Sequence, residues 1–265
     1  MPVLVDCGIA PGCSNLILGR MTAAYERVER FTCHVGGLPR VRTLPWEYKA
    51  PFSPVDVIEE YTRPARFIRG GKEVVEPALS ELEPVEFAGI GTLEAFNTDG
   101  LRTLLAVPGV PFMVEKTLRY PGTAERLRLL RDAGFFSSEP VEVGGRPVAP
   151  VELAAALLFP AWELHEGEED LTAMRVVTDA VDAGRPVRET FELVDRYDPV
   201  SGISSMARTT GYTCTAMVRL VATGRWREPG VEAPEAVGRD GAAFEFVMAE
   251  LARRGVVFTR TREGR

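Results

Sequence analysis

The sequence lacks the glycine-rich turns that bind nucleotide phosphates. Neither G-x-G-x-x-G nor G-x-x-x-x-G-K-[ST] occurs in its 265 residues, and Gly89-Ile90-Gly91 has no third glycine and precedes a predicted strand. G-x-S-x-G and H-E-x-x-H are also missing, and two histidines make a histidine-based triad hard to build. These gaps argue against a self-contained nucleotide site and against the common hydrolase patterns.

Cysteine and net positive charge are also scarce. The four cysteines form no C-x-x-C pair, and adjacent Cys33 and His34 would point to opposite faces of a strand, so no metal site is predicted. The net charge of −7 without a basic cluster disfavours nucleic acid as a partner. No leader pattern and no apolar run near the ~20 residues of a membrane span is present. We therefore expect reduced thiols in a cytoplasmic protein that binds neither nucleic acid nor membrane.

Helical and extended patterns alternate along the chain. Helices are predicted over 14–29, 53–61, 122–133, 151–158, 205–221 and 240–253. Strands are predicted over 3–5, 31–35, 66–68, 73–75, 85–87, 92–96, 113–120, 174–181, 187–197 and 256–261. Because strands come in hairpins as often as they alternate with helices, the pattern indicates an α+β fold with a mixed, largely antiparallel sheet. We expect one domain over 1–265, with a surface excursion or subdomain near 136–165.

Two segments concentrate polar side chains. In 95–105 (AFNTDGLRTLL), Asn97, Asp99 and Arg102 cluster where a strand gives way to a helix, although Asn97 or Asp99 could equally act as a helix cap. In 204–214 (SSMARTTGYTC), a helix begins with an arginine in its second turn. An arginine there opposes the helix dipole unless an anion lies close by.

A third polar segment, 114–122 (VEKTLRYPG), is predicted to be a strand. Alternation would place Lys116 and Tyr120 on one face and Thr117 and Arg119 on the other, with one face toward a cleft. The three arginines of these segments could form a set that binds a carboxylate, because a guanidinium fits a carboxylate bidentately. They could equally form separate surface ion pairs. The three are Arg102, Arg119 and Arg208.

Longer blocks of the sequence form a recognisable set. They are DCGIAPGCSN, HVGGLP, YKAPFSPVDVIEEYTRPARFI, GTLEAFNTDGLRTLL, EKTLRYPG, LFPAWEL, EGEEDLTAMRV and SMARTTGYTCTA. From Val5 to about Arg254, this set resembles the saccharopine dehydrogenase family, in particular its saccharopine dehydrogenase-like and lysine 6-dehydrogenase branch. The resemblance implies NAD(P)-linked oxidation, or reductive formation, of a C–N bond in an amino acid such as lysine or saccharopine.

The resemblance also implies how the chain is organised. Family members carry an N-terminal Rossmann domain whose sheet leads into a D-x-G-x-x-P-G crossing, and this chain opens at that crossing. It therefore resembles the substrate and dimerisation portion, similar in fold to the C-terminal domain of glyceraldehyde-3-phosphate dehydrogenase, with helices mainly on one sheet face. We expect a homodimer that does not bind NAD or NADP alone and that uses a Rossmann domain supplied separately.

The family's motifs also assign roles to individual positions. Asp6 matches a residue facing substrate, Val35 and Gly36 match the segment that approaches the nicotinamide, and Arg119 matches an arginine that holds a substrate carboxylate. Asn97 and Asp99 match a polar turn near substrate. The residues that flank the same cleft are Lys116, Tyr120, Arg208 and Tyr212, and Arg102, from the arginine set above, is a further candidate for binding substrate. The candidates for the general acid or base are Asp6, Asp99 and Lys116.

One position departs from the family pattern. R-Y-P-G is commonly followed by histidine, and here Thr123 follows it. If that histidine assists proton transfer, this chain lacks it. The rival interpretation is a non-enzymatic protein that retained the sheet for dimerisation or small-molecule binding, and a truncated reading frame is a third.

Overall fold

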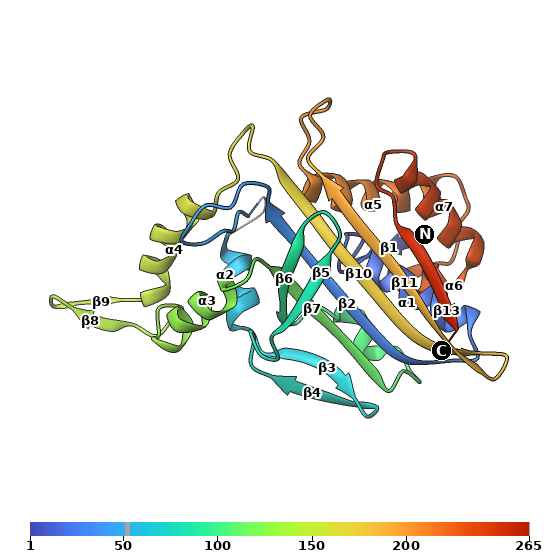
Figure 1. Cartoon of the computed structure of the whole chain (residues 1–265), viewed down its shortest axis with the longest axis horizontal. Helices are drawn as coiled ribbons and strands as arrows, with labels where there is room; N and C mark the ends of the chain where they lie inside the picture. The colour runs from blue at the N-terminus through green and yellow to red at the C-terminus, as the bar shows by residue number, and fades with distance from the viewer. Residues whose placement is uncertain (51–53, 265) are drawn as a thin grey trace.

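The computed structural model describes residues 1–50 and 54–264, which form a long twisted sheet with helices against one face (Figure 1). In these residues the main sheet has nine strands, in the order β13-β11-β10-β2-β7-β3-β4, with β6 also paired to β7 and β5 to β6. The strands are β2 (Arg27–Pro39), β3 (Ala65–Arg69), β4 (Lys72–Glu76), β5 (Glu83–Phe87), β6 (Gly91–Asn97), β7 (Phe112–Arg119), β10 (Asp170–Asp182), β11 (Arg185–Arg196) and β13 (Thr259–Gly264).

The sheet is mixed, because one of its pairs is parallel. β2 and β7 run parallel, and the remaining pairs of this sheet are antiparallel. The long β10–β11 hairpin turns at Ala183 and Gly184, whose φ angles of 49° and 73° suit the left-handed turn that matches strand twist. The predicted α+β class with a mixed, largely antiparallel sheet is confirmed.

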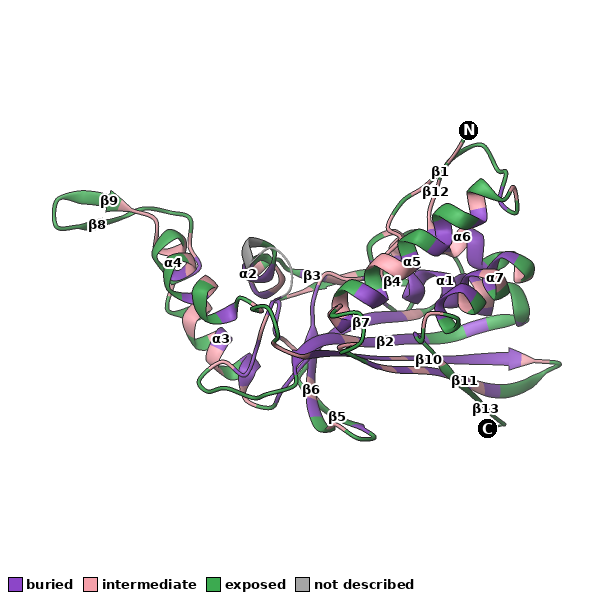
Figure 2. Ribbon diagram, turned by 90° about the horizontal axis from the view of Figure 1, so that it is seen from above, coloured by how far each residue is buried: buried purple, intermediate pink, exposed green. Residues whose placement is uncertain are grey.

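Helices cover one face of the sheet (Figure 2). The helices over this face are α1 (Cys13–Ala24), α5 (Ser205–Ala222), α6 (Pro234–Arg239) and α7 (Gly241–Ala252). Their apolar sides pack on Phe31, Met174 and Phe191 of the sheet in the largest core cluster. Asp240 caps α7 by accepting hydrogen bonds from the amides of Ala242 and Ala243. We call this side of the sheet the helix face.

The opposite side, the open face, is largely polar. Cross-strand ion pairs join Arg175 to Glu192 and Arg188 to Asp179. The β5–β6 hairpin folds over part of this face, above a small apolar cluster that includes Leu118. Charged pairs therefore fill much of the open face of β10 and β11.

A second lobe extends from one end of the sheet (Figures 1 and 2). Its helices are α2 (Pro54–Thr62), α3 (Thr123–Asp132) and α4 (Pro150–Trp162), and they pack around the fully buried ring of Trp162. Between α3 and α4 the hairpin of β8 (Val141–Val143) and β9 (Arg146–Val148) projects outward. The boundaries of an excursion near 136–165 stay a prediction.

Two boundaries differ from those expected, and a third lies outside the described residues. The helix expected through residue 29 ends at Ala24, because β2 begins at Arg27 to pair with the full length of β10. The first strand is β1 (Pro2–Leu4), which pairs with the unpredicted β12 (Gly230–Glu232) outside the main sheet. The expected cap at Ser53 lies outside the described residues.

Candidate functional site

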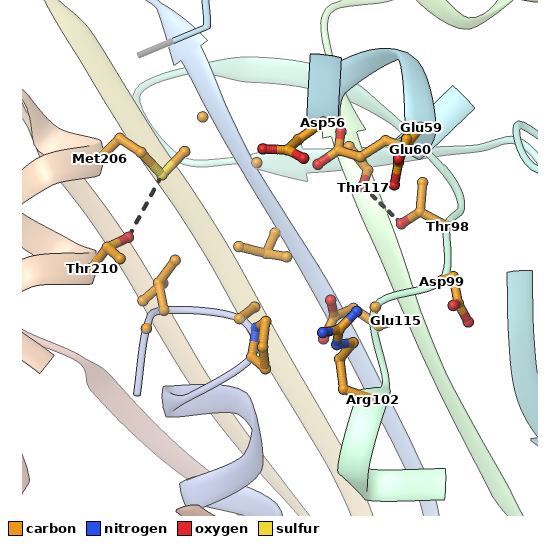
Figure 3. Close-up of a pocket in the computed structure, with 18 of the residues that line it drawn as sticks. Asp56, Glu59, Glu60, Thr98, Asp99, Arg102, Glu115, Thr117, Met206 and Thr210 are labelled. Carbon is orange, nitrogen blue, oxygen red and sulfur yellow. Dashed lines mark hydrogen bonds between the residues drawn. The ribbon is translucent and has the colours of Figure 1, made fainter. Parts of the chain in front are cut away.

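A cavity of about 660 Å³ opens on the helix face where the two lobes meet (Figure 3). Its floor is the parallel pair β2–β7, and its walls are the loop between β1 and α1, helix α2, the loop at 98–102 and the start of α5. These segments are far apart in sequence, so the cavity exists only in the folded chain. Asp6, Asp99, Arg102 and Arg119 line it, together with Val35 and Gly36.

Strand β7 divides its side chains between the two faces, as the alternation predicted. Glu115, Thr117 and Arg119 line the cavity. Lys116 points to the open face, where its ammonium donates to the Glu81 carbonyl at 2.7 Å and lies 3.0 Å from a Glu83 oxygen. Lys116, a candidate acid or base, is therefore not brought to the cavity.

Arg119 is held by the protein itself. The residue is 3 % exposed, and its Nε donates to the Tyr61 hydroxyl at 3.0 Å while one terminal nitrogen donates to Glu60 at 2.9 Å. The other terminal nitrogen donates to the Leu118 carbonyl, and the guanidinium carbon lies 4.4 Å from the Tyr48 ring centroid. These contacts fix the guanidinium, and only its remaining N–H groups are left for a ligand.

Asp99 also has a partner inside the protein. Arg66 donates to both of its oxygens, at 2.9 and 2.8 Å, and the Arg66 amide donates at 3.2 Å. Burial alone would raise the pKa of Asp99, but the hydrogen bonds from Arg66 outweigh it and hold that pKa below its usual range. A carboxylate stabilised in this way is a poor proton acceptor, so this geometry favours a structural role.

Asp6 has a different setting. It sits at φ 53° at the start of the loop into α1, lines the cavity, and has no ion-pair or hydrogen-bond partner among the described residues. Its carboxylate is thus available to a ligand. Of the two acidic candidates from the sequence, Asp6 has the more suitable environment for proton transfer.

The loop after Asp6 contains glycines and leads from a strand into a helix, as a phosphate-binding loop does, but its backbone amides are already hydrogen-bonded within the chain. The Gly12 amide donates to the Asn15 side chain, Cys13 to the Gly8 carbonyl and Ser14 to the Ile9 carbonyl. The amides that would face a phosphate at a helix N-terminus are therefore already used. The crossing can border a substrate, but it offers no free amide cradle.

Val35 and Gly36 lie on the cavity floor. A Cβ on Gly36 would lie 2.4 Å from the Leu118 carbonyl oxygen, so close packing against β7 by itself requires glycine there. A Cβ on Gly37 would meet the Met206 methyl group at 2.1 Å. Strand β2 therefore has no side chain at Gly36 and Gly37, and an approach of nicotinamide to this segment stays a prediction.

Four other predicted residues also lie outside the cavity lining. Asn97 is fully buried and donates to the Ser80 hydroxyl, and the Tyr120 hydroxyl donates to the Pro39 carbonyl at 2.9 Å. Arg208 lies 3.3 Å from Asp195 and 3.1 Å from Asp198. Tyr212 packs beside this arginine, whose guanidinium carbon is 5.7 Å from the ring centroid.

The anion expected near Arg208 is thus supplied by the chain's own aspartates. The face of α5 that borders the cavity instead carries Met206 and Thr210. The proposed set of three arginines is not assembled, because only Arg102 and Arg119 reach the cavity. Arg102 is exposed, adopts φ 53°, and forms no ion pair with another described residue.

Glu115 is the residue that the sequence analysis missed. It is 5 % exposed, lines the cavity, and its Oε2 accepts no hydrogen bond from any described residue. Burial, followed by the nearby negative charge of Glu60, raises the pKa of Glu115 to about 7. A carboxyl group that titrates near neutrality in a cavity can accept or donate a proton, and such groups concentrate at functional sites. The signal in the sequence was one acidic residue inside an otherwise apolar strand start, FMVE.

The described residues provide neither a metal site nor a membrane-spanning helix. No group of three or more His, Cys, Asp or Glu side chains there has the arrangement to hold a metal ion. No helix in the described part of the chain has the length and apolar character needed to cross a membrane.

The chain was compared with known proteins. Residues 8–256 match the family described as the saccharopine dehydrogenase C-terminal domain. The mitochondrial alpha-aminoadipic semialdehyde synthase of Bos taurus is 23 % identical over 331 residues, covering 97 % of this chain but only 35 % of that protein. The chain thus spans about a third of the length of that curated relative.

Solved structures show the same fold. Saccharopine dehydrogenase (L-Glu forming) from Saccharomyces cerevisiae superposes with a TM-score of 0.79 at 19 % identity, covering 99 % of this chain and 74 % of that one. A homospermidine synthase from Legionella pneumophila, solved in complex with NAD, gives 0.59 at 9 % identity, covering 99 % and 64 %. The family match extends over nearly the whole chain and includes the cavity lining from Gly8 onward, and the chain belongs to the saccharopine dehydrogenase C-terminal domain family.

Proposed function

We propose that this chain provides the substrate-binding and proton-handling portion of an NAD(P)-dependent oxidoreductase that acts on the C–N bond of an amino acid. The observation that carries the proposal is the cavity, in which the carboxylate of Asp6, without a partner among the described residues, lines a wall and the buried carboxyl of Glu115 lies on the floor. Membership of the family supports the reaction class.

The cavity's residues suit the proton steps of such a reaction. NAD(P), when bound, would accept or supply the hydride. Oxidation of an amine to an imine also requires loss of a proton from nitrogen, and Asp6 and Glu115 are the groups positioned to accept it. Arg102, exposed and without an ion-pair partner, is available for a substrate carboxylate. Held by Glu60 and Tyr61, Arg119 supports the wall of the cavity.

The chain alone is expected to bind neither NAD nor NADP with useful affinity. The loop into α1 uses its amides internally at Gly12, Cys13 and Ser14, so the phosphates find no cradle. We therefore infer that the dinucleotide is bound mainly by a separate Rossmann domain. Isothermal titration calorimetry of residues 1–265 with NAD and NADP should give no micromolar binding, and a micromolar Kd would contradict this division of roles.

A homodimer is the second part of the proposal. The open face of the sheet leaves Val177 and Val194 only partly buried between ion pairs, and a second copy would cover them. Sedimentation velocity at micromolar concentration should show a dimer or a larger species. Because that face is polar, we expect the dimer to weaken as salt is raised. A monodisperse monomer at low salt would count against it. The cytoplasmic location stays a prediction.

A further inference from the structure

The cavity contains more negative than positive side chains. Among the described residues, six carboxylates line it, against three guanidinium groups. Three of the carboxylates are neutralised by arginine: Glu59 by Arg63, Glu60 by Arg119 and Asp99 by Arg66. The three that have no ion pair among the described residues are Asp6, Asp56 and Glu115.

Glu115 is the most confined of the three. With 5 % of its surface exposed, its carboxyl group lies against Gly100, where a Cβ would come within 1.9 Å of Oε1. The glycine therefore leaves room for the carboxyl group, and Oε2 has no hydrogen-bond donor among the described residues. The Cys33 thiol, a weak donor, hydrogen-bonds the carboxyl group, but a buried oxygen left without a donor is costly, and a ligand that supplies one would be stabilised there.

Arg102, the positive group nearest to Glu115, does not neutralise the excess of carboxylates in the cavity. Figure 3 shows the Arg102 side chain beside the carboxyl group of Glu115, yet no ion pair joins them. If Arg102 moved to pair with Glu115, Asp6 and Asp56 would still lack a counter-charge. The cavity's field therefore favours a ligand that brings positive charge with it.

We propose that the cavity takes a ligand of net positive charge, and that an ammonium group of this ligand docks at the carboxylate of Glu115. This inference rests on the proposed function and narrows its substrate class to compounds with more ammonium groups than carboxylates, such as diamino acids and diamines. A polycarboxylate is disfavoured, because Arg102 is the cavity arginine without an ion pair and Arg119 is held by Glu60.

Binding should follow the ionisation of Glu115. The groups that face it are Cys33 on β2, Glu60 on α2, and Asp99 and Arg102 around the 98–102 loop. Burial and the negative charges of Glu60 and Asp99 raise the pKa of Glu115 to about 7, although the hydrogen bond from Cys33 and the positive charge of Arg102 lower it. The docking carboxylate therefore forms as the pH rises through neutrality. A diamine keeps both of its charges over this range.

The test is calorimetric titration of the full chain with 1,5-diaminopentane and, in parallel, with glutarate, a dicarboxylate of equal length. We expect the diamine to bind about tenfold more tightly at pH 8 than at pH 6, and glutarate to bind more weakly than the diamine at both. Glu115→Gln should weaken diamine binding at least tenfold at pH 8 and remove the pH dependence. Glu142→Gln, on the exposed β8 strand, is the control and should match the unmodified chain.

Three results would overturn the inference: glutarate binding as tightly as the diamine, Glu115→Gln binding the diamine normally, or neither probe binding. The proposed function is judged separately, by hydride transfer. If a dicarboxylic amino acid is oxidised but the diamine does not bind, the inference on ligand charge is refuted and the oxidoreductase function stands. If the diamine binds but no amino acid or diamine is oxidised, the oxidoreductase function is refuted and the inference on ligand charge stands.

Discussion

Replacing Arg119 by alanine is expected to lower the free energy of unfolding by about 3 kcal/mol, because it removes a buried guanidinium that pairs with the partly exposed Glu60 and donates to Tyr61. Glu60 would lose its counter-charge and the Tyr61 hydroxyl would lose a donor, while the Tyr48 ring would lose the guanidinium beside it. In thermal denaturation, the Tm should fall by about 6–12 °C for a chain of this size. A role in substrate binding alone, which the resemblance implies for Arg119, would instead leave the fold intact after this change.

A neighbouring ion pair provides the control. Glu59 on α2 pairs with Arg63, just beyond the end of that helix, but the Arg63 and Glu59 side chains are 46 % and 52 % exposed. Such a pair contributes under about 1 kcal/mol, so Arg63→Ala should change the Tm by only a few degrees. An equal fall in Tm for the two variants would show that Arg119 stabilises the fold no more than the exposed Arg63 does. That result would contradict its role as a support of the cavity wall.

Replacing Glu115 by glutamine is expected to raise the free energy of unfolding by about 3 kcal/mol at pH 8. The folded protein holds the pKa of Glu115 at about 7, against an ordinary value of 4.5, so folding favours the protonated group. In the unmodified chain this stabilisation is complete below about pH 4.5 and is lost as the pH rises through 7. Glutamine does not ionise, so the variant keeps at pH 8 the stability that the unmodified chain has only when Glu115 is protonated.

Urea denaturation of both proteins from pH 4 to pH 8 measures the difference. The two stabilities should be similar near pH 4 and diverge up to pH 7, with no further divergence above it. Glu142→Gln should change stability by less than about 0.5 kcal/mol throughout, because its side chain is exposed. A variant less stable than the unmodified chain at pH 8 would mean that Glu115 has a stabilising partner and is not poised for a ligand.

The two expectations for Glu115 together describe a functional residue. The same substitution should stabilise the fold and weaken the binding of a cation. Proteins tolerate such a cost to stability where a site needs a strained or poorly solvated group. Arg119 contrasts with it, because its contacts within the protein account for its burial.

Much of the fold could be predicted from local patterns. Alternation in 113–120 separated Thr117 and Arg119 from Lys116, and that separation is confirmed because each side chain's direction depends only on the strand's period. The turns after residues 69 and 182 carry glycine, and hairpins form at both. The end of α1 could not be predicted, because it depends on β2 pairing along all of β10.

The site was harder to predict, because residues distant in sequence determine whether a charged side chain forms an ion pair or is free to bind a ligand. Arg208 has Asp195 and Asp198 beside it, and Lys116 has Glu83, none of which its own segment reveals. Glu115 was overlooked for a related reason: an acid at the start of an apolar strand has no local signal of burial without a partner. A family resemblance identified the cavity's segments, and the three-dimensional contacts then showed which of their side chains reach it.

The most direct test of the account is hydride transfer by residues 1–265 joined to a dinucleotide-binding domain from a related saccharopine dehydrogenase. Calorimetry first establishes that the fusion binds NAD or NADP, and absorbance at the nicotinamide band then follows its reduction with a panel of amino acids and diamines. We predict substrate-dependent reduction that falls at least about a hundredfold in Asp6→Asn, which keeps the shape but removes a proton acceptor. A folded fusion that binds the dinucleotide and the diamine yet reduces nothing across the panel would contradict an oxidoreductase and would favour a binding protein.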